Sequence, residues 1–408
     1  MKYTIFFSLC VLTLSCSVNE NEGTSDSKSY LSLIDSVFYE YISTNRLNGG
    51  AVLVAHKGEI ILHKAYGKAL AEGDEDMNTQ HIFRIASMTK QITAVAALML
   101  LEEGKYTLED PLWWYLPEFR SPVILDSIVK SDSSFIGHKA QNEIRIKHLF
   151  NHTSGIPYGF DDPELNILFQ KFNISEGFEE RPITNRENAK RIAQLPIIHE
   201  PGSNNTYGLS YDILGTLIEI WSGKNLYEFF SERIFQPLEM NDTHFYLPEN
   251  KYDRLPDVFM SSHQGVKPAE YTMVNYPVMG AKTYFSGGAD ISCTIEDYWK
   301  FAEMVRNKGR LNGTRLLSES TIDFITTQQL EGGIETLGWG LGLVNKSNQH
   351  EHTPPLGSMQ WGGFFSTNCL VDPQNELVVL TFLQMYPNWE WNMHLKVENI
   401  AYSSLEHR

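Results

Sequence analysis

Lysine and arginine are in the minority in this chain, and nowhere do they gather into a basic cluster. The 408 residues include 33 Lys and Arg against 50 Asp and Glu, which gives a formal net charge of −17 at pH 7. Nucleic-acid binding depends on clustered basic side chains that neutralise phosphates. The sequence therefore predicts no nucleic-acid partner.

Cysteine is also scarce. Of the four cysteines, Cys10 and Cys16 lie near the N-terminus, which leaves Cys293 and Cys369 for the folded part. A single pair in a chain of this length does not make a disulfide scaffold. Whether these two are bonded or are buried free thiols stays open at this point.

The N-terminal apolar run is too short to cross a bilayer, which takes about 20 apolar residues. It reads "TIFFSLCVLTLSC", follows Lys2 and gives way to the polar "SVNENEGTSDSKS". This layout resembles a bacterial lipoprotein signal, with residues 1–15 as signal peptide, Cys16 as the lipidated first residue and 16–29 as a flexible tether. An ordinary signal peptide cleaved nearby is the alternative. We expect an exported protein, held to a membrane by lipid on the periplasmic or cell-surface side.

Several catalytic signatures are missing. There is no G-x-S-x-G, so the nucleophile elbow of an α/β-hydrolase is not supported. The single H-x-H, in "QHEH" at 349–352, lacks the further His and Asp of a zinc hydrolase and is predicted to be a solvated loop. No glycine-rich phosphate loop follows a predicted strand. The sequence predicts neither a metal nor an organic cofactor.

Strand patterns stand at both ends of the chain around a helical middle. The stretch 49–67 has two apolar runs around Lys57 and Gly58, a hairpin signal, and "GWGLGLV", "SMQWGGFFSTNCLVDP" and "ELVVLTFLQM" predict strands near the C-terminus. Residues 87–103 form an apolar run without a breaker, typical of a buried helix. We expect an α+β fold without internal linker over 30–404, whose terminal strands share one antiparallel sheet beside a mostly helical lobe. Residues 118–145, rich in Ser, Asp and Lys, are predicted to form a surface excursion.

Ser87 and Lys90 bear most directly on chemistry. They lie three positions apart in "RIASMTKQITA", so a helix places both side chains on one face. A serine hydroxyl becomes a good nucleophile when a neighbouring base takes its proton. A lysine removed from water holds its extra proton less tightly and can serve as that base. Alone, S-x-x-K is a weak motif, and an N-cap serine before a surface lysine is the plain alternative.

Longer segments favour the catalytic interpretation. "HIFRIASMTKQITAVAALMLLEEGK" resembles the nucleophile helix of the serine β-lactamase and penicillin-binding-protein superfamily, most closely its class C β-lactamase branch. Further segments resemble it in the family's order: "IRIKHLFNHTSGIPYG", "EPGSNNTYGLSYDILGTLIEIWSGKNLYEFFSERIFQPLEMNDTHF" and "FSGGADISCTIEDYWKFAEMV". The resemblance implies a β-lactamase/transpeptidase-like fold, with Ser87 as acylated nucleophile and Lys90 as partner base. It makes Tyr207, in "TYGL", the tyrosine of the Y-x-N motif, a phenol that can take and return a proton.

The family's third motif, usually K-T-G or H-x-G on an edge strand, matches Trp361, Gly362 and Gly363. By this resemblance the backbone N–H of Phe364 lies beside that of Ser87, and two such donors form an oxyanion hole. The glycines let a substrate approach the strand closely.

Two departures from the family's motifs bear on the substrate. Leu209 stands where Y-x-N has Asn, and Trp361 where K-T-G has Lys. In lactamases these polar groups contact the substrate amide and carboxylate, and a missing buried partner costs about 1–3 kcal/mol. Y-x-L with W-G-G resembles the family VIII carboxylesterases and related acyltransferases. We therefore expect an ester or β-lactam-like small molecule to contact Leu209, Trp361, Gly362 and Gly363.

The resemblance implies a serine hydrolase that cleaves carboxylic esters through an acyl-enzyme on Ser87. A β-lactamase, or a D-amino-acid or cell-wall peptidase, uses the same machinery and is the first alternative; an alcohol acceptor would make the enzyme a transferase. A non-catalytic binding module of the same fold is the second. His152, in "NHTSG", could be imagined as a triad base, but its segment is structural in the family. The natural ester and the oligomeric state stay open.

Overall fold

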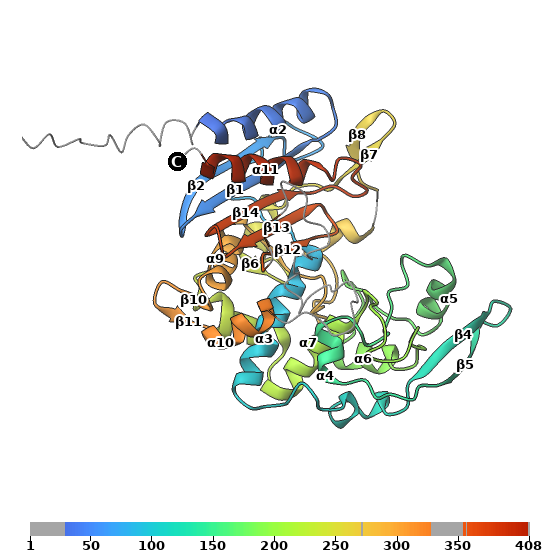
Figure 1. Ribbon diagram of the computed structural model, residues 1–408. Helices are drawn as coiled ribbons and strands as arrows, with labels where there is room; N and C mark the ends of the chain where they lie inside the picture. The colour runs from blue at the N-terminus through green and yellow to red at the C-terminus, as the bar shows by residue number, and fades with distance from the viewer. Residues whose placement is uncertain (1–28, 271, 328–353, 356, 407–408) are drawn as a thin grey trace, which may run out of the picture.

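The computed structural model describes residues 29–270, 272–327, 354–355 and 357–406. Five strands from the two ends of the chain form one antiparallel sheet in the order β12-β13-β14-β1-β2. Their bounds are β1 Gly49–His56, β2 Glu59–Gly67, β12 Met359–Gly362, β13 Thr367–Asp372 and β14 Leu377–Leu383. Figure 1 shows the blue N-terminal strands beside the red C-terminal ones. The predicted α+β class, with a sheet built from both chain ends, is confirmed.

The central strand β1 has both faces covered, and its side chains alternate between two cores. Val52 and Val54 belong to a core under α2 (Leu33–Ser43) and α11 (Met393–Glu406). Leu53 points into the main core on the opposite face, where α9 (Ile295–Arg306) packs against the sheet. A strand buried on both faces reads as a continuous apolar run, which is how "GGAVLVAH" appears in the sequence.

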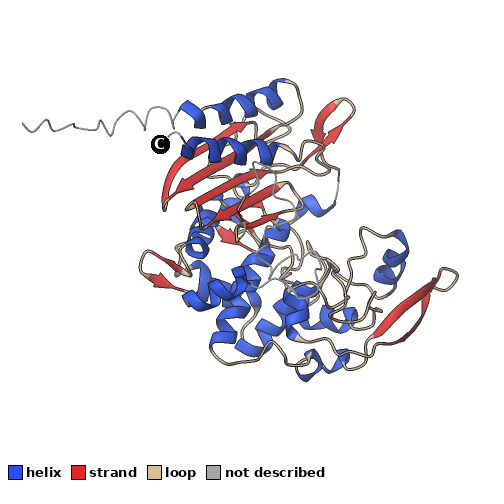
Figure 2. Ribbon diagram, viewed as in Figure 1, coloured by secondary structure: helices blue, strands red, loops and turns tan. Residues whose placement is uncertain are grey.

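Below the sheet lies the helical lobe from the middle of the chain (Figure 2). At its centre α3 (Thr89–Glu102) packs against α7 (Ser210–Ser222). Every α3 residue from Thr89 to Leu100 is buried, as its all-round apolar sequence predicts. The shorter helices of this lobe are α4 Ile146–Phe150, α5 Pro163–Lys171, α6 Asn185–Ile192 and α8 Leu226–Phe230.

The surface excursion expected at 118–145 has more regular structure than its polar composition suggested. Strands β4 (Val123–Val129) and β5 (Ser134–Lys139) pair as an antiparallel hairpin that reaches out from the helical lobe (Figure 1). Most of its side chains are exposed or half-buried. Of the strand residues only Ile124 is buried, in the main core, and Ile128 and Phe135 are partly buried against that core.

Short strands and one further helix complete the described chain. They are β3 Phe83–Arg84, β6 Thr243–His244, β7 Phe259–Ser262, β8 Gly265–Pro268, β9 Ser292–Cys293, β10 Arg310–Leu311, β11 Thr314–Arg315 and α10 Glu319–Thr327. Strands β3, β9 and β6 form a three-stranded sheet, which places the chain just before Ser87 beside the chain that follows Gly288.

Cys293 and Cys369 are both buried free thiols, so the pairing question that the sequence left open is answered. Burial raises the pKa of both thiols. No helix in the described part of the chain combines the length and the apolar character that a membrane crossing requires. The predicted strand at 338–344, the loop at 349–352 and the N-terminal residues 1–28, with Cys16, lie outside the described residues.

Candidate active site

Ser87 lies in a short 3-10 turn, Ala86–Met88, that leads directly into α3. The sequence predicted a helix from Ser87; the α-helix itself begins two residues later, at Thr89. The turn is held from outside, because the Arg84 guanidinium donates hydrogen bonds of 2.5, 2.9 and 2.6 Å to three backbone carbonyl oxygens. Ala86 adopts φ = 44°, in the left-handed region that residues other than glycine rarely occupy. This backbone kink leaves Ser87 on the wall of a cavity.

Lys90 has no exposed surface and lies directly behind Ser87. Its Nζ is 3.3 Å from Ser87 Oγ, 3.0 Å from Tyr158 Oη and 2.8 Å from the carbonyl oxygen of Gly288. Helical spacing therefore brings the two predicted residues together. A neutral amine has two N–H donors and one lone pair. If the donors serve Tyr158 and Gly288, the lone pair faces the Ser87 hydroxyl.

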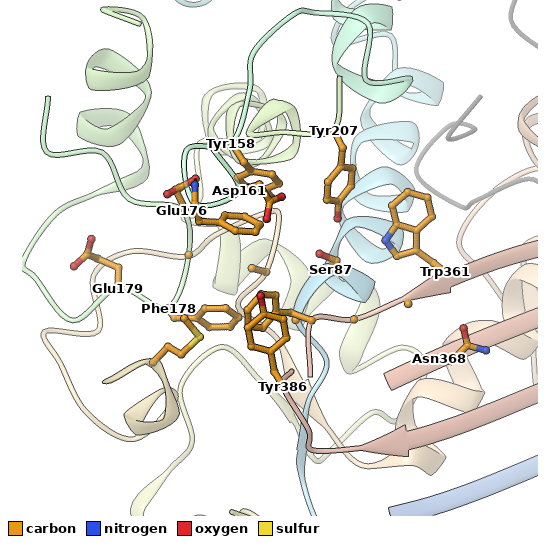
Figure 3. A pocket seen from close by; sticks show the side chains of 18 of the residues that line it. Ser87, Tyr158, Asp161, Glu176, Phe178, Glu179, Tyr207, Trp361, Asn368 and Tyr386 are labelled. Carbon is orange, nitrogen blue, oxygen red and sulfur yellow. The ribbon is translucent and has the colours of Figure 1, made fainter. Parts of the chain in front are cut away.

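Tyr207 stands beside this pair. Lys90 Nζ lies over its ring, 4.6 Å from the centroid. Figure 3 shows the phenol oxygen of Tyr207 turned toward Ser87, with Trp361 on the far side of the tyrosine ring. The Tyr207 and Trp361 ring centroids are 5.8 Å apart. The three residues predicted to carry the chemistry thus converge at one place.

The W-G-G motif ends the edge strand β12 and borders the same cavity. The N–H of Gly363 donates to the Thr367 carbonyl oxygen at 2.8 Å, and a Cβ built on Gly363 would lie 2.3 Å from the carbonyl oxygen of Ile85. Only glycine fits there. Among the described residues none accepts a hydrogen bond from the Phe364 N–H, and Phe364 lines the cavity with Ser87. Both amides of the predicted oxyanion hole therefore belong to residues that line one cavity.

The cavity has a volume of about 1160 Å³ and a largely aromatic wall. Its aromatic lining consists of Tyr158, Phe160, Phe178, Tyr207, Trp361, Phe364 and Tyr386. Several rings touch one another: Phe364 stacks on Tyr386 with centroids 3.6 Å apart, and Phe160 meets Phe364 edge-on at 6.1 Å. Among the described residues no group of three His, Cys, Asp or Glu side chains is arranged to hold a metal ion.

Comparison with known families settles the relationship. The Beta-lactamase family model matches residues 34–395. The chain belongs to the β-lactamase family. Esterase EstB from Burkholderia gladioli is 29% identical over 391 residues, which are 90% of this chain and 93% of EstB. With the family match and a relative that is named an esterase, the protein is an enzyme of the serine hydrolase and acyl-transfer class.

Two solved structures agree with the fold. EstCE1, a hydrolase with promiscuous acyltransferase activity, superposes with a TM-score of 0.79 at 24% identity and covers 92% of this chain and 99% of its own. Simvastatin synthase LovD from Aspergillus terreus reaches a TM-score of 0.78 at 20% identity, covering 92% and 98%. These similarities confirm the predicted β-lactamase/transpeptidase-like fold. The curated relative EstB, an esterase, fits the carboxylesterase branch that the motifs indicated.

Leu209 is not where the family's Y-x-N motif led us to expect it. Its side chain has no exposed surface, belongs to the main core and does not line the cavity. It stands at the N-terminal end of α7, where the chain turns inward after Tyr207. The prediction that Leu209 contacts the substrate is wrong for this structure, because a side chain packed in the core has no surface to offer. Trp361, Gly362 and Gly363 do line the cavity.

Tyr158 is the contact that sequence reasoning missed. Its phenol oxygen accepts a hydrogen bond from Lys90 Nζ, and its ring centroid lies 5.5 Å from that of Tyr207. Burial, then the nearby Tyr207 and Asp212, raise the pKa of Tyr158 well above its usual value. The phenol therefore keeps its proton and can pass a hydrogen bond onward. Its segment, "GIPYG", was part of the family resemblance, but nothing in its spacing pointed to Lys90.

Asp212 on α7 is a second missed residue. Its Oδ1 accepts hydrogen bonds from Tyr284 Oη at 3.0 Å and Ser286 Oγ at 2.5 Å, while Oδ2 has no partner among the described residues. Burial raises the pKa of Asp212, and the nearby charge of Lys90 opposes that rise. A buried carboxyl thus stands close to the lysine amine.

His152 packs inside the site without a hydrogen-bond role. Its ring lies parallel to that of Trp361, with centroids 6.3 Å apart, and 5.0 Å from that of Tyr207. Neither ring nitrogen has a partner among the described residues. Burial lowers the pKa of His152 well below its usual value, so the ring is neutral. It fills space behind the catalytic wall and makes no contact with Ser87 Oγ.

Proposed function

We propose that the protein is a carboxylesterase in which Ser87 is the nucleophile, Lys90 and Tyr207 transfer protons, and the Ser87 and Phe364 amides bind the oxyanion. The observation that carries the proposal is the 3.3 Å approach of Lys90 Nζ to Ser87 Oγ on the wall of an aromatic cavity. The name of EstB, an esterase with 29% identity, supports it. So does Trp361, which brings an apolar ring where a lactamase motif has a base.

In the acylation step Ser87 Oγ attacks the ester carbonyl carbon, and its proton passes to the neutral Lys90 amine or to the Tyr207 phenolate. The carbonyl oxygen becomes an anion that accepts hydrogen bonds from the two amides. When the tetrahedral intermediate collapses, the C–O bond to the alcohol breaks, and the group that took the serine proton, Lys90 or Tyr207, returns it to the leaving oxygen. Water then repeats the sequence on the acyl-enzyme. An alcohol in place of water would give acyl transfer.

The test compares p-nitrophenyl butyrate with nitrocefin, using the wild type, Ser87→Ala and a control. Ser203→Ala changes an exposed serine outside the cavity and serves as the matched control. We expect ester hydrolysis to fall at least about 10³-fold in Ser87→Ala and to persist in Ser203→Ala, with little nitrocefin turnover. A serine-reactive phosphonate should add mass to the wild type only.

Efficient nitrocefin cleavage would favour a β-lactamase instead. Absence of turnover together with absence of phosphonate labelling would favour a binding module.

We also propose that the mature chain is a lipoprotein: residues 1–15 are a signal peptide, Cys16 carries the lipid, 16–29 form a tether and 30–404 the hydrolase domain, on the periplasmic or cell-surface side of a membrane. The signal-like N-terminal pattern supports this. Expressed in a bacterium, the wild type should sediment with membranes and Cys16→Ser should appear in the soluble exported fraction. Equal distribution of the two proteins would contradict the lipid anchor.

A further inference from the structure

One wall of the cavity is acidic. Asp161, Glu176, Glu179 and Glu180 line it together with a single arginine, Arg181. The positive charge of Arg181 is paired within the wall, because its guanidinium forms a two-point ion pair with Glu179, including an Nε to Oε1 contact of 2.7 Å. Figure 3 shows Asp161, Glu176 and Glu179 on one side of Ser87, with Trp361 and Asn368 on the other. Three carboxyl groups therefore face the cavity without an ion-pair partner in the part of the chain that the structure describes.

Glu176 is fixed within this wall. Its Oε1 accepts hydrogen bonds from the backbone N–H groups of Gly159 at 2.6 Å and Phe160 at 3.3 Å. The side chain is half-buried, and burial raises the pKa of Glu176 to about 7. A carboxyl group that is desolvated in this way gains from a cationic neighbour, because the neighbour stabilises its ionised form.

Aromatic rings line the same cavity as these carboxyl groups. Tyr158 and Phe160 stand on either side of Gly159, whose N–H donates to Glu176. Their ring centroids are 5.0 Å apart. Phe160 in turn meets Phe364, which stacks on Tyr386. Aromatic faces attract ammonium groups through the negative face of the ring, and carboxylates attract them through charge. Two independent features of the wall thus favour the same kind of ligand group.

The opposite wall carries two neutral amide side chains, Gln360 and Asn368. Gln360 Nε2 and Asn368 Nδ2 each donate to Glu398 Oε1 at 2.7 Å. These contacts hold one N–H of each amide against Glu398, and neither of the two neutral side chains adds a positive charge to the cavity that they line. A substrate carboxylate would find no uncommitted cation among the described lining residues.

We infer that the natural substrate is an ester that carries an ammonium group, lodged between the Glu176 and Asp161 carboxyls and the ring of Phe160 while Ser87 attacks the carbonyl. This inference rests on the proposed esterase function and names its substrate class. A carboxylate-bearing substrate is disfavoured by the same wall.

The test uses two esters of the same shape that differ in one charge: butyrylcholine and 3,3-dimethylbutyl butyrate, in which carbon replaces the ammonium nitrogen. At pH 8 and low salt we expect kcat/KM for the choline ester to exceed that of the neutral ester at least about tenfold. Glu176→Gln and Asp161→Asn should each lower this ratio several-fold. The ratio is the readout, so a general loss of activity cancels.

Glu164→Gln is the matched control, because Glu164 is exposed on α5, pairs with Lys130 and does not line the cavity. It should leave the ratio unchanged. A ratio near one, or a high ratio that neither cavity variant lowers, overturns the inference, while hydrolysis of p-nitrophenyl butyrate would still uphold the esterase.

If no ester is cleaved, the proposed function fails and binding decides the inference separately. Calorimetry then compares choline with 3,3-dimethyl-1-butanol on the Ser87→Ala protein. Tighter binding of choline that weakens several-fold in the Ser87→Ala/Glu176→Gln double variant supports the ammonium site. Equal or absent binding of choline overturns it.

Discussion

Lys90 joins three separate segments at one amine. Its Nζ meets Ser87 one turn earlier in the chain, Tyr158 from the loop after α4 and the Gly288 carbonyl from the loop before β9. A tetrahedral nitrogen has four directions, of which the side chain takes one. The three contacts therefore fix the remaining directions, and the loss of one would let the amine turn away from the serine.

Tyr158→Phe tests this dependence. The variant removes the 3.0 Å contact to Lys90 and keeps the ring. Because a neutral hydrogen bond contributes about 1 kcal/mol, we expect kcat for p-nitrophenyl butyrate to fall about fivefold, with KM changed much less. Tyr106→Phe is the matched control: Tyr106 is a buried phenol that donates to the Ala97 carbonyl oxygen away from the cavity. An unchanged kcat in Tyr158→Phe would show that the amine is held without it.

At this scale the sequence predicted contacts within one helix better than contacts between loops. Ser87 and Lys90 meet because helical geometry fixes a spacing of three residues. Tyr158 and Asp212 approach the same amine only through tertiary packing, which spacing does not encode. The prediction that Leu209 contacts the substrate was wrong for a related reason. A motif gives the order of residues along the chain, but it does not give the direction in which a side chain points at the start of a helix.

Among the elements, the edge strand β12 and the turn after it shape the substrate side of the site. The strand pairs with β13 through Trp361 and Gly362, opposite Cys369 and Asn368. The following residue, Gly363, then passes within contact distance of Ile85, just before the serine turn. The two segments that supply the oxyanion-hole amides, those of Ser87 and Phe364, therefore approach each other closely at Gly363.

Gly363→Ala should separate them. Its Cβ would lie 2.3 Å from the Ile85 carbonyl oxygen and 2.2 Å from Thr367 Oγ1, so the strand must move. We expect a loss of about 10²-fold in kcat, the usual cost of a misplaced oxyanion donor, and a lower melting temperature. Gly362→Ala is the matched comparison, since its nearest neighbour would be 3.4 Å away and the fold should keep its stability. Equal melting temperatures and equal kcat for both variants would contradict this role of Gly363.

Element predictions succeeded where a buried face and a turn signal coincided. The β1–β2 hairpin was predicted from two apolar runs around Lys57 and Gly58, and both residues have positive φ, 55° and 80°, as a two-residue turn requires. The β4–β5 hairpin has only one buried strand residue, Ile124, so its Ser, Asp and Lys content favoured an irregular surface segment. Its strands are defined by pairing with each other, which composition alone does not reveal.

The molecule as a whole keeps several carboxyl groups away from water. Burial raises the pKa of Glu398 and Glu219 to about 7 and that of Asp290 to about 8. Each of these acids holds its proton in the folded state at pH values where the unfolded chain has released it. Their contribution to stability is therefore greatest below the unfolded pKa and declines as the pH rises through the folded pKa.

Glu398→Gln isolates one such contribution. Glu398 on α11 is 2% exposed, its Oε1 accepts from Gln360 and Asn368, and a glutamine carbonyl can accept both bonds. At pH 4.5 the variant and the wild type should differ little. Between pH 4.5 and 8 the variant should gain stability relative to the wild type, by on the order of 1–3 kcal/mol, because only the wild type must ionise a buried group. Denaturant unfolding at several pH values measures the difference.

Subtracting one protein from the other removes the titration of the remaining residues, including His148 and His244, whose pKa values burial lowers to about 4. Glu406→Gln provides the control on the same helix, since Glu406 is exposed at its end. Its difference from the wild type should stay flat with pH. A flat difference for Glu398→Gln as well would mean that Glu398 is ionised in the folded protein throughout this range, and that the Gln360 and Asn368 contacts, together with water, compensate for its burial.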